Sequence, residues 1–341
     1  MAYGPGVVLG RKGVVGSVHF VDEDYWPHDT TLFVKDFHYN DARFVYYFFL
    51  AHASDLSALD VGSANPTLNR NHVHPMVVMW PGLNEQREIA TVLRALDDRI
   101  ALLRETNATL GAIAQALFKS WFVDFDPVLA KQQGLAPAGM DEATAALFAD
   151  CFDESATLLC PLGWRNGKVE DLLELAYGKA LKATDRVAGD VPVYGSGGLT
   201  GFHIEPLIAG PNVIVGRKGT VGSLYWEDRP CFPIDTVFFL RPKVPLTFCF
   251  CQLSVLGLDG MNTDGAVPGL NRNNVYRLPV VIPAPSVLTA FDDLVGALRR
   301  SIFSNEMRAQ TLTTLRDTLL PRLISGQLRL PEAQAEMEEA A

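Results

Sequence analysis

The stretch VLGRKGVVGSVHFVDEDYWPHDTTLFVKD, residues 8–36, occurs a second time in the chain in altered form. It aligns without gaps onto IVGRKGTVGSLYWEDRPCFPIDTVFFLRP at residues 214–242, an offset of 206 positions. Both copies share GRKGxVGS followed by PxDT. Because apolar runs flank each GRKG segment, each copy predicts two strands joined by a tight turn, with Arg and Lys exposed at its tip.

A second pair of stretches repeats at almost the same distance. NPTLNRNHV at residues 65–73 matches VPGLNRNNV at residues 267–275, an offset of 202 positions. The two offsets differ by only four residues, so one module has been duplicated. At the second offset Pro81 matches Pro283, and a long segment with helical periodicity follows each proline.

The two long segments predict a pair of helices. From Glu85 to about Phe122, apolar residues recur at alternating spacings of four and three, which is a heptad seam, and the second copy repeats it. Helices of about 36 residues would be on the order of 54 Å long, and neither would be stable alone in water. We therefore expect them to pack on each other and hold the modules apart. The alternative is that each helix lies on its own module.

The polar residues in the seam predict its register. If the helices are antiparallel with Asn107 opposite Asn305, the numbers of facing residues sum to 412. A paired polar residue in an apolar seam fixes register at some cost in stability, and we assign that role to these two asparagines. Arg316 opposite Leu96 fits this register poorly. The apolar pairs that it predicts are Leu93 with Leu319, Ile100 with Leu312, Leu110 with Ile302, and Leu117 with Val295.

Composition bounds the class of protein. The 341 residues are 48% hydrophobic and 20% charged, which predicts two folded modules of mixed α/β (α+β) structure. A formal net charge of -10 disfavours nonspecific coating of nucleic acid, so any site for DNA must be a local patch. The five cysteines include no CxxC pair, which favours neither disulfides nor a metal site.

Motifs for catalysis and targeting were not found in the sequence. The chain lacks an adenine-methyltransferase motif, a nuclease carboxylate cluster and a helicase core, so we expect no catalytic residues, no cofactor and no metal. The N-terminus lacks the apolar core of a signal peptide, and no stretch approaches 18 uninterrupted apolar residues. A cytoplasmic location without membrane contact is the expectation.

The GRKG segments supply the first candidate contacts with nucleic acid. Their flanks are strand-like, unlike those of a phosphate-binding loop that opens a helix. Such turns could set Arg11, Lys12, Arg217 and Lys218 against phosphates or base edges. A solvated structural turn is the alternative interpretation.

The LNRN stretches supply the second set. Asparagine and arginine suit bidentate contacts with adenine and guanine, but asparagine also caps turns and helix starts, and we place that structural role slightly ahead. The candidates are Asn69, Arg70, Asn271, Arg272 and Asn273.

A third set belongs to the second module alone. The segments KALKATDR at 179–186 and VPVYGSGGLTGF at 191–202 place basic residues beside a glycine-rich turn. A recognition surface is one interpretation of them, and the charged edge of a loop is the commoner explanation. The candidates are Lys179, Lys182, Arg186 and Ser196.

These features together resemble the specificity subunit of type I restriction-modification systems. The resemblance rests on the first helix, LNEQREIATVLRALDDRI at 83–100, and on LFKSWFVDFDPVLAK at 117–131. It continues through GLAPAGMDEATAALFADCF at 134–152 and PLGW at 161–164, and through TLLPRLISGQL at 318–328. It covers nearly the whole chain.

The resemblance implies two target recognition domains that each read half of a split DNA sequence, spaced by two antiparallel helices. It also implies a noncatalytic subunit that binds two adenine-N6 methyltransferase subunits and, through the complex, ATP-driven restriction/translocase subunits. Double-stranded DNA and these subunits are the expected partners. The alternatives are a truncated or regulatory interaction subunit without full DNA specificity and, more distantly, an enzyme whose GRKG loops hold a nucleotide.

One departure from the family concerns the first module. Nothing in it matches residues 161–207 of the second, so half-site reading by residues 1–80 is in question and specificity is expected mainly in 161–283. The expected division is a partial first recognition domain, a first spacer helix, a linker, a second recognition domain, a second spacer helix and an acidic tail. Their ranges are 1–82, 83–123, 124–160, 161–284, 285–325 and 326–341.

Overall fold

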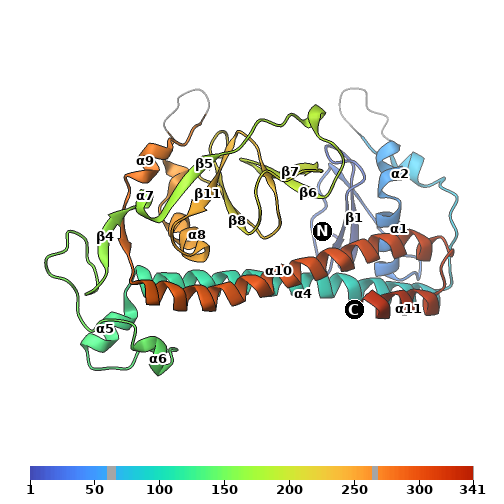
Figure 1. Cartoon of the computed structure of the whole chain (residues 1–341). Helices are drawn as coiled ribbons and strands as arrows, with labels where there is room; N and C mark the ends of the chain where they lie inside the picture. Colours follow the sequence, from blue (N-terminus) through green and yellow to red (C-terminus); the bar gives the residue numbers. More distant parts are fainter. Residues whose placement is uncertain (60–66, 263–267, 341) are drawn as a thin grey trace. The chain divides into compact units, whose positions relative to one another are not determined.

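Two compact units make up the chain. The computed structural model describes residues 1–59, 67–262 and 268–340. Residues 65–66 and 267, which begin the repeated stretches 65–73 and 267–275, lie outside the described residues. The first unit comprises Met1–Thr106 and Ser304–Ala341, and the second comprises Asn107–Phe303. Figure 1 labels their helices and strands, and the predicted mixture of helices and sheets is confirmed. No helix within the described residues is long and apolar enough to span a membrane.

A three-stranded antiparallel sheet, of order β2-β1-β3, forms the centre of the first unit. Its strands are β1 (Gly6–Gly10), β2 (Val18–Val21) and β3 (Thr31–Phe33). Three short helices accompany them: α1 (Ala42–Ala51), α2 (Ala53–Ala58) and α3 (Arg70–Val73).

Both long helices contribute to each unit. They are α4 (Leu83–Phe122) and α10 (Pro285–Ile324). In the first unit, the start of α4 is tied to α1 by Gln86, which is buried. Its side-chain amide donates to Asn40 Oδ1 at 2.8 Å, and its Oε1 accepts from the backbone N–H of Asp41 at 3.0 Å. Because Asp41 in turn caps α1, these bonds fix where α1 and α4 begin.

Within the first unit, the early part of α4 packs on the late part of α10, so the two helices run antiparallel. Leu93 and Leu319 share one buried cluster with Phe44 of α1, and Ile100 and Leu312 share another. These are the pairs expected from residue numbers that sum to 412. The helices therefore pack on each other, as expected, and in this unit both also pack on α1, which belongs to the module that precedes α4. Residues 330–340 of the expected acidic tail form α11 (Leu330–Ala340).

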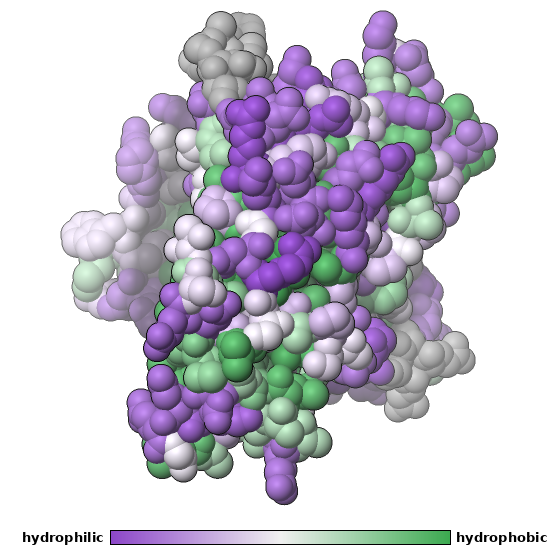
Figure 2. All heavy atoms as spheres, turned by 60° about the vertical axis from the view of Figure 1, so that its left-hand side comes forward, coloured by the Kyte–Doolittle hydropathy of each residue, from purple (hydrophilic) through white to green (hydrophobic). Residues whose placement is uncertain are grey.

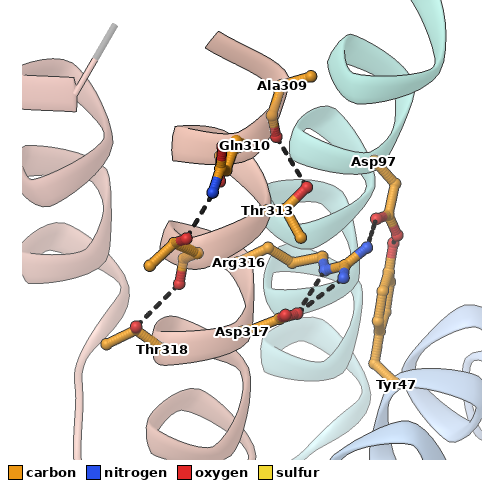
Figure 3. A network of polar contacts seen from close by, with 9 residues as sticks. Tyr47, Asp97, Ala309, Gln310, Thr313, Arg316, Asp317 and Thr318 are labelled. Atoms are coloured by element: carbon orange, nitrogen blue, oxygen red, sulfur yellow. Dashed lines mark hydrogen bonds and ion pairs between the residues drawn. The ribbon is translucent and has the colours of Figure 1, made fainter. Parts of the chain in front are cut away.

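The expected misfit of Arg316 is wrong, because its charge is paired (Figure 3). Its guanidinium donates to Asp97 of α4 at 2.8 Å and to the neighbouring Asp317 at 2.7 Å. The hydroxyl of Tyr47, from α1, donates to the other oxygen of Asp97 at 2.7 Å. Burial acts to lower the pKa of Arg316, but the two carboxylates outweigh it and raise the pKa. A polar network thus joins three helices at this point of the seam.

The second unit carries the larger set of sheets. A four-stranded sheet has the order β5-β11-β8-β9, a three-stranded sheet the order β10-β6-β7, and β12 pairs with β4. The strands are β4 (Arg165–Lys168), β5 (Leu173–Tyr177), β6 (Val191–Gly195), β7 (Gly198–His203), β8 (Asn212–Gly216), β9 (Leu224–Glu227), β10 (Phe232–Pro233), β11 (Val237–Pro242) and β12 (Pro279–Ile282). The short helices are α5 (Asp126–Gln132), α6 (Glu142–Ala145), α7 (Val169–Leu172), η1 (Ala183–Asp185), α8 (Leu246–Val255), η2 (Leu258–Gly260) and α9 (Arg272–Tyr276).

An aromatic cluster joins the long helices of the second unit to its sheet. Phe118 and Phe122 of α4 and Phe291 of α10 pack against Phe248 of α8 in one buried core. Trp164, after the 124–160 segment, packs on Phe122 with ring centroids 5.7 Å apart. The aromatic residues of the 117–131 segment therefore belong to the core of this unit. Leu117 and Val295, another predicted pair, also belong to it.

The duplication is visible strand by strand. In the first unit Leu9 of β1 faces Val18 of β2 and Leu32 of β3. In the second unit Val215 of β8 faces Leu224 of β9 and Phe238 of β11. Each of these residues lies 206 positions after its counterpart. The strands β2-β1-β3 therefore repeat β9-β8-β11 in both order and register.

Candidate functional site

The GRKG segment of the second unit forms the loop between β8 and β9. It is longer than the predicted tight turn, because Gly219 and Gly222 take left-handed backbone angles (φ 86° and 73°) that let the chain turn twice. The backbone N–H groups of Arg217 and Lys218 both donate to the carbonyl of Thr236 at 3.0 Å. Arg217 is partly buried, whereas Lys218 is exposed. These two hydrogen bonds thus fix the backbone of the loop at Arg217 and Lys218, the residues that carry its positive charges.

The LNRN stretch is bonded to the GRKG loop. The N–H of Leu270 donates to the carbonyl of Arg217 at 2.8 Å. Asn271 is the N-cap of α9, and its side-chain oxygen accepts from the N–H of Asn273 at 2.9 Å. The capping role placed ahead in the sequence is confirmed here. Because Arg272 is the next residue, the cap fixes the backbone position from which the side chain of Arg272 extends.

Tyr177, at the end of β5, lies between the two arginines. The guanidinium carbons of Arg217 and Arg272 each lie 4.8 Å from the centre of its ring. Arg217 also donates to the backbone carbonyl of Asp235 at 3.0 Å, and Arg272 donates to the carbonyl of Leu175 at 3.5 Å. Cation–π contacts of this kind contribute about 0.5–1 kcal/mol each at exposed sites. The three side chains therefore hold one another in place.

These residues line one pocket of about 330 Å³. Three cations face it, and the residues described as its lining include no carboxylate. Figure 2 brings the side of α9 and β4 forward and shows hydrophilic side chains gathered over much of this face. The arrangement can bind a phosphate or the acceptor-rich edge of a guanine, while the ring offers a stacking surface. Its lining residues are Tyr177, Arg217, Lys218, Gly269, Leu270, Asn271, Arg272 and Asn273.

The first unit repeats this geometry without the tyrosine. The N–H of Leu68 donates to the carbonyl of Arg11 at 2.8 Å, as Leu270 does to Arg217. Asn69 caps α3 by accepting from the N–H of Asn71 at 2.9 Å. Arg11 and Arg70 thus start from corresponding backbone positions, and Lys12 forms a bridge with Thr67 where Lys218 does with Gly269. The GRKG and LNRN motifs are therefore bonded to each other through the backbone in each unit.

Comparisons with known proteins bear on this pair of sites. A family model described as the type I restriction modification DNA specificity domain matches residues 4–112. The HindI specificity subunit of a type I restriction enzyme from Haemophilus influenzae is 24% identical over 331 residues, with 77% of this chain and 71% of that protein covered. The MjaIX specificity subunit from Methanocaldococcus jannaschii is 23% identical over 326 residues, with 85% and 70% covered. The chain is thus similar to type I restriction-modification specificity subunits.

The fold of this chain also has a solved counterpart. The crystal structure of a type I restriction-modification S subunit from M. genitalium matches with a TM-score of 0.59 and 19% sequence identity. The match covers 95% of this chain and 84% of that one. The two chains therefore share a fold.

The remaining candidate residues lie outside the pocket lining. Arg186 donates to the carbonyl of Thr200 at 2.6 Å and so holds β7, which is a structural role. Ser196 lies beside the GRKG loop, since Ser223 donates to its carbonyl at 2.8 Å. Lys179 and Lys182 are exposed on the segment that follows Tyr177. The structure thus gathers Arg217, Lys218 and the LNRN residues and leaves the three basic residues of 179–186 outside the lining.

Tyr177 is not among the residues predicted from the sequence. The signal that could have found it is the alternating pattern of LELAY, which predicts a strand ending in an aromatic residue just before Lys179. The position of its ring between two arginines depends on the pairing of β5 with β11, and a local sequence pattern does not predict that pairing. Within the described residues, no cluster of three or more His, Cys, Asp or Glu side chains could hold a metal ion.

The two seam asparagines fall in different units. Asn107 belongs to the second unit, where its side-chain amide donates to the carbonyl of Ile302 at 3.1 Å. Asn305 belongs to the first. Their pairing stays a prediction.

Proposed function

We propose that this specificity subunit reads one part of a split DNA target through the pocket around Tyr177, and that its long helices dock methyltransferase subunits. The observation that carries the first part is that Arg217 and Arg272 converge on the ring of Tyr177, with Lys218 lining the same pocket. Arginine held in a fixed orientation suits bidentate bonding to guanine O6 and N7, and lysine suits phosphate. Because the chain has a net charge of -10, a site for DNA must be a local basic patch, and a pocket lined by three cations is such a patch.

The domain roles follow from this proposal. Residues 161–284 form the main recognition domain and residues 1–82 a smaller one, with 83–123 and 285–325 as spacer helices and 124–160 as linker. The subunit itself is noncatalytic. Adenine methylation and ATP-dependent cleavage belong to the methyltransferase and restriction/translocase subunits with which it assembles on double-stranded DNA.

The experiment compares three arginine variants in the assembled complex. Arg217→Ala and Arg272→Ala should each cost about 1–3 kcal/mol of binding and relax one base position. Arg241→Ala is the matched control, because Arg241 is an exposed arginine paired with Glu174 outside the pocket. Anisotropy titrations with target and scrambled duplexes measure the effect. If all three variants bind both duplexes like the parent protein, the pocket does not read DNA.

A second candidate function is a regulatory interaction subunit that binds methyltransferase partners without full DNA specificity. The smaller set of strands in the first unit favours it. Co-purification with a methyltransferase subunit, followed by gel shifts, separates the two candidates. A regulatory interaction subunit should co-purify with the methyltransferase subunit, and the resulting complex should bind every duplex with equal affinity.

A further inference from the structure

The β6–β7 turn, residues 195–198, packs against the GRKG loop of the second unit. The hydroxyls of Ser223 and Tyr225 both donate to the carbonyl of Ser196, at 2.8 and 3.1 Å. Gly198 takes a left-handed backbone angle (φ 100°), and a Cβ atom there would lie 3.2 Å from the ring of Tyr225. The turn is therefore held by two hydroxyls and by one aromatic ring.

The strand that leads into the turn is joined to the backbone that holds the cations. The N–H of Ile234 donates to the carbonyl of Tyr194, the residue before the turn, at 2.9 Å. Two residues after Ile234, the carbonyl of Thr236 accepts from the N–H groups of Arg217 and Lys218. The turn and the pocket that these two cations line therefore share one hydrogen-bonded framework.

The side chain of Ser196 lies next to this pocket. A Cβ atom on Gly219, the residue after Lys218, would lie 3.4 Å from the hydroxyl oxygen of Ser196. Ser196 is partly exposed, and Gly197 is exposed. Within the part of the chain that the structure describes, the Ser196 hydroxyl forms no hydrogen bond with the protein. A group that can both donate and accept is thus available at the edge of the pocket.

The bond from Ser223 to the turn is not needed to close the GRKG loop. In both units the corresponding serine donates to a carbonyl three residues earlier, Ser17 to Val14 and Ser223 to Thr220, each at 3.1 Å. That bond closes the loop in each unit. Because Ser223 also donates to Ser196, its second bond serves to place the turn.

We propose that the β6–β7 turn is a second base-reading element, in which the Ser196 hydroxyl determines specificity and Tyr225 is a positioning residue. The proposal rests on the proposed function, because the same duplex lies over the pocket. Successive bases are about 3.4 Å apart along a strand, and Gly219 separates the serine from the pocket. The serine and Arg272 therefore meet different bases of one half-site. A hydroxyl can bond to any base edge, so it discriminates only where its backbone is fixed.

Selection of a randomised DNA library by the assembled complex tests this proposal. Ser196→Ala should lose preference at one base position, different from the position lost in Arg272→Ala. It should also weaken binding of the parent target about threefold to tenfold, since one hydrogen bond is lost. Ser254→Ala is the matched control and should retain both, because Ser254 is exposed on α8 and its hydroxyl donates to Phe250 of the same helix.

Tyr225→Phe tests the positioning role. The variant removes the hydroxyl that donates to Ser196 and keeps the ring that packs on Gly198. It should reduce preference at the same base position as Ser196→Ala, by about threefold, and leave the other positions unchanged. A tyrosine that only stabilises the fold would weaken binding at every position alike, and that result would remove its positioning role.

The outcomes separate this proposal from the proposed function. If Arg272→Ala alters base preference and Ser196→Ala does not, the pocket reads DNA and the turn does not. If neither variant alters it, both proposals fail. Equal loss of affinity for all sequences in Ser196→Ala also overturns the base-reading role of the turn, because the hydroxyl would then contact a phosphate.

Discussion

At the residue scale, Tyr177 explains why two arginines far apart in the sequence act together. Arg217 follows β8 and Arg272 begins α9, yet both guanidiniums lie on one ring. The ring is half-exposed, so its faces hold the cations without burying them. A guanidinium that is already oriented loses less conformational entropy when it binds.

Replacing Tyr177 tests this orientation. Tyr177→Ala should weaken binding of target DNA by the assembled complex about tenfold, or about 1.4 kcal/mol, since two cation–π contacts are lost. Tyr177→Phe keeps the ring and should stay within about twofold of the parent protein. Anisotropy titrations measure both. Equal losses in the two variants would mean that the hydroxyl, and not the ring, matters.

Glu227 predicts how the stability of the second unit depends on pH. It is buried, and it accepts from Arg229 at 3.0 Å and from the hydroxyl of Tyr194 at 2.9 Å. Burial acts to raise the pKa of Glu227, but these hydrogen bonds outweigh it and hold the pKa below its ordinary 4.5. Because the folded-state pKa is lower than that of the unfolded chain, the carboxylate stabilises the fold above about pH 4.5, and this contribution is lost as the pH falls through the folded-state pKa.

Glu227→Gln should therefore destabilise the protein by about 2 kcal/mol at neutral pH, with the difference shrinking as the pH falls below about 4.5. Thermal unfolding across the pH range measures this. Glu174→Gln, at an exposed ion pair, is the control and should have little effect. A destabilisation of equal size at every pH would contradict the account.

At the element scale, the polar network of the helix pair should be worth more than a surface ion pair. Arg316 and Asp97 are partly buried, with side chains 23% and 29% exposed. In a double-mutant cycle, Arg316→Ala and Asp97→Ala should show a coupling of about 1–2 kcal/mol in urea unfolding. The exposed pair Arg94 and Asp98 on the same helix is the control, with an expected coupling of about 0.3–0.5 kcal/mol. Equal couplings would show that the network does not stabilise the seam.

The proposed role of Asn107 and Asn305 in fixing the register is also testable. Leucine at both positions should allow the helices to slip by a heptad, since a buried polar residue selects register at a cost in stability. Cysteines report it: Leu93→Cys with Leu319→Cys marks the native register, and Leu93→Cys with Leu312→Cys marks the shifted one. The shifted disulfide should form only in the double-leucine variant. Its absence there would remove the role.

The sequence predicts elements well where a local pattern determines them. The heptad seam predicted the helix pair and its register within the first unit, and the GRKG flanks predicted both hairpins. Strand formation that depends on a distant partner is not local in this way: residues 77–80 form no strand, whereas β12, at the corresponding position of the second unit, pairs with β4. Likewise, the sequence predicted a misfit at Arg316 because it does not show that Asp97 and Tyr47, which lie on two other helices, face this residue.

At the scale of the whole molecule, the site depends on where the basic residues gather. The chain carries a net charge of -10, so affinity for DNA cannot come from its average surface. The motifs predicted which arginines and lysines form the site. They could not predict that Arg186 donates a hydrogen bond to the carbonyl of Thr200, because that bond depends on how β7 packs against the loop that precedes it.

The most direct test of the account is selection of a randomised DNA library by the assembled complex. It compares the parent protein with Arg272→Ala and Lys218→Ala. The account predicts that Arg272→Ala loses preference at one base of one half-site and leaves the other half-site unchanged, whereas Lys218→Ala weakens binding to all sequences equally. An unaltered base preference in Arg272→Ala would contradict it.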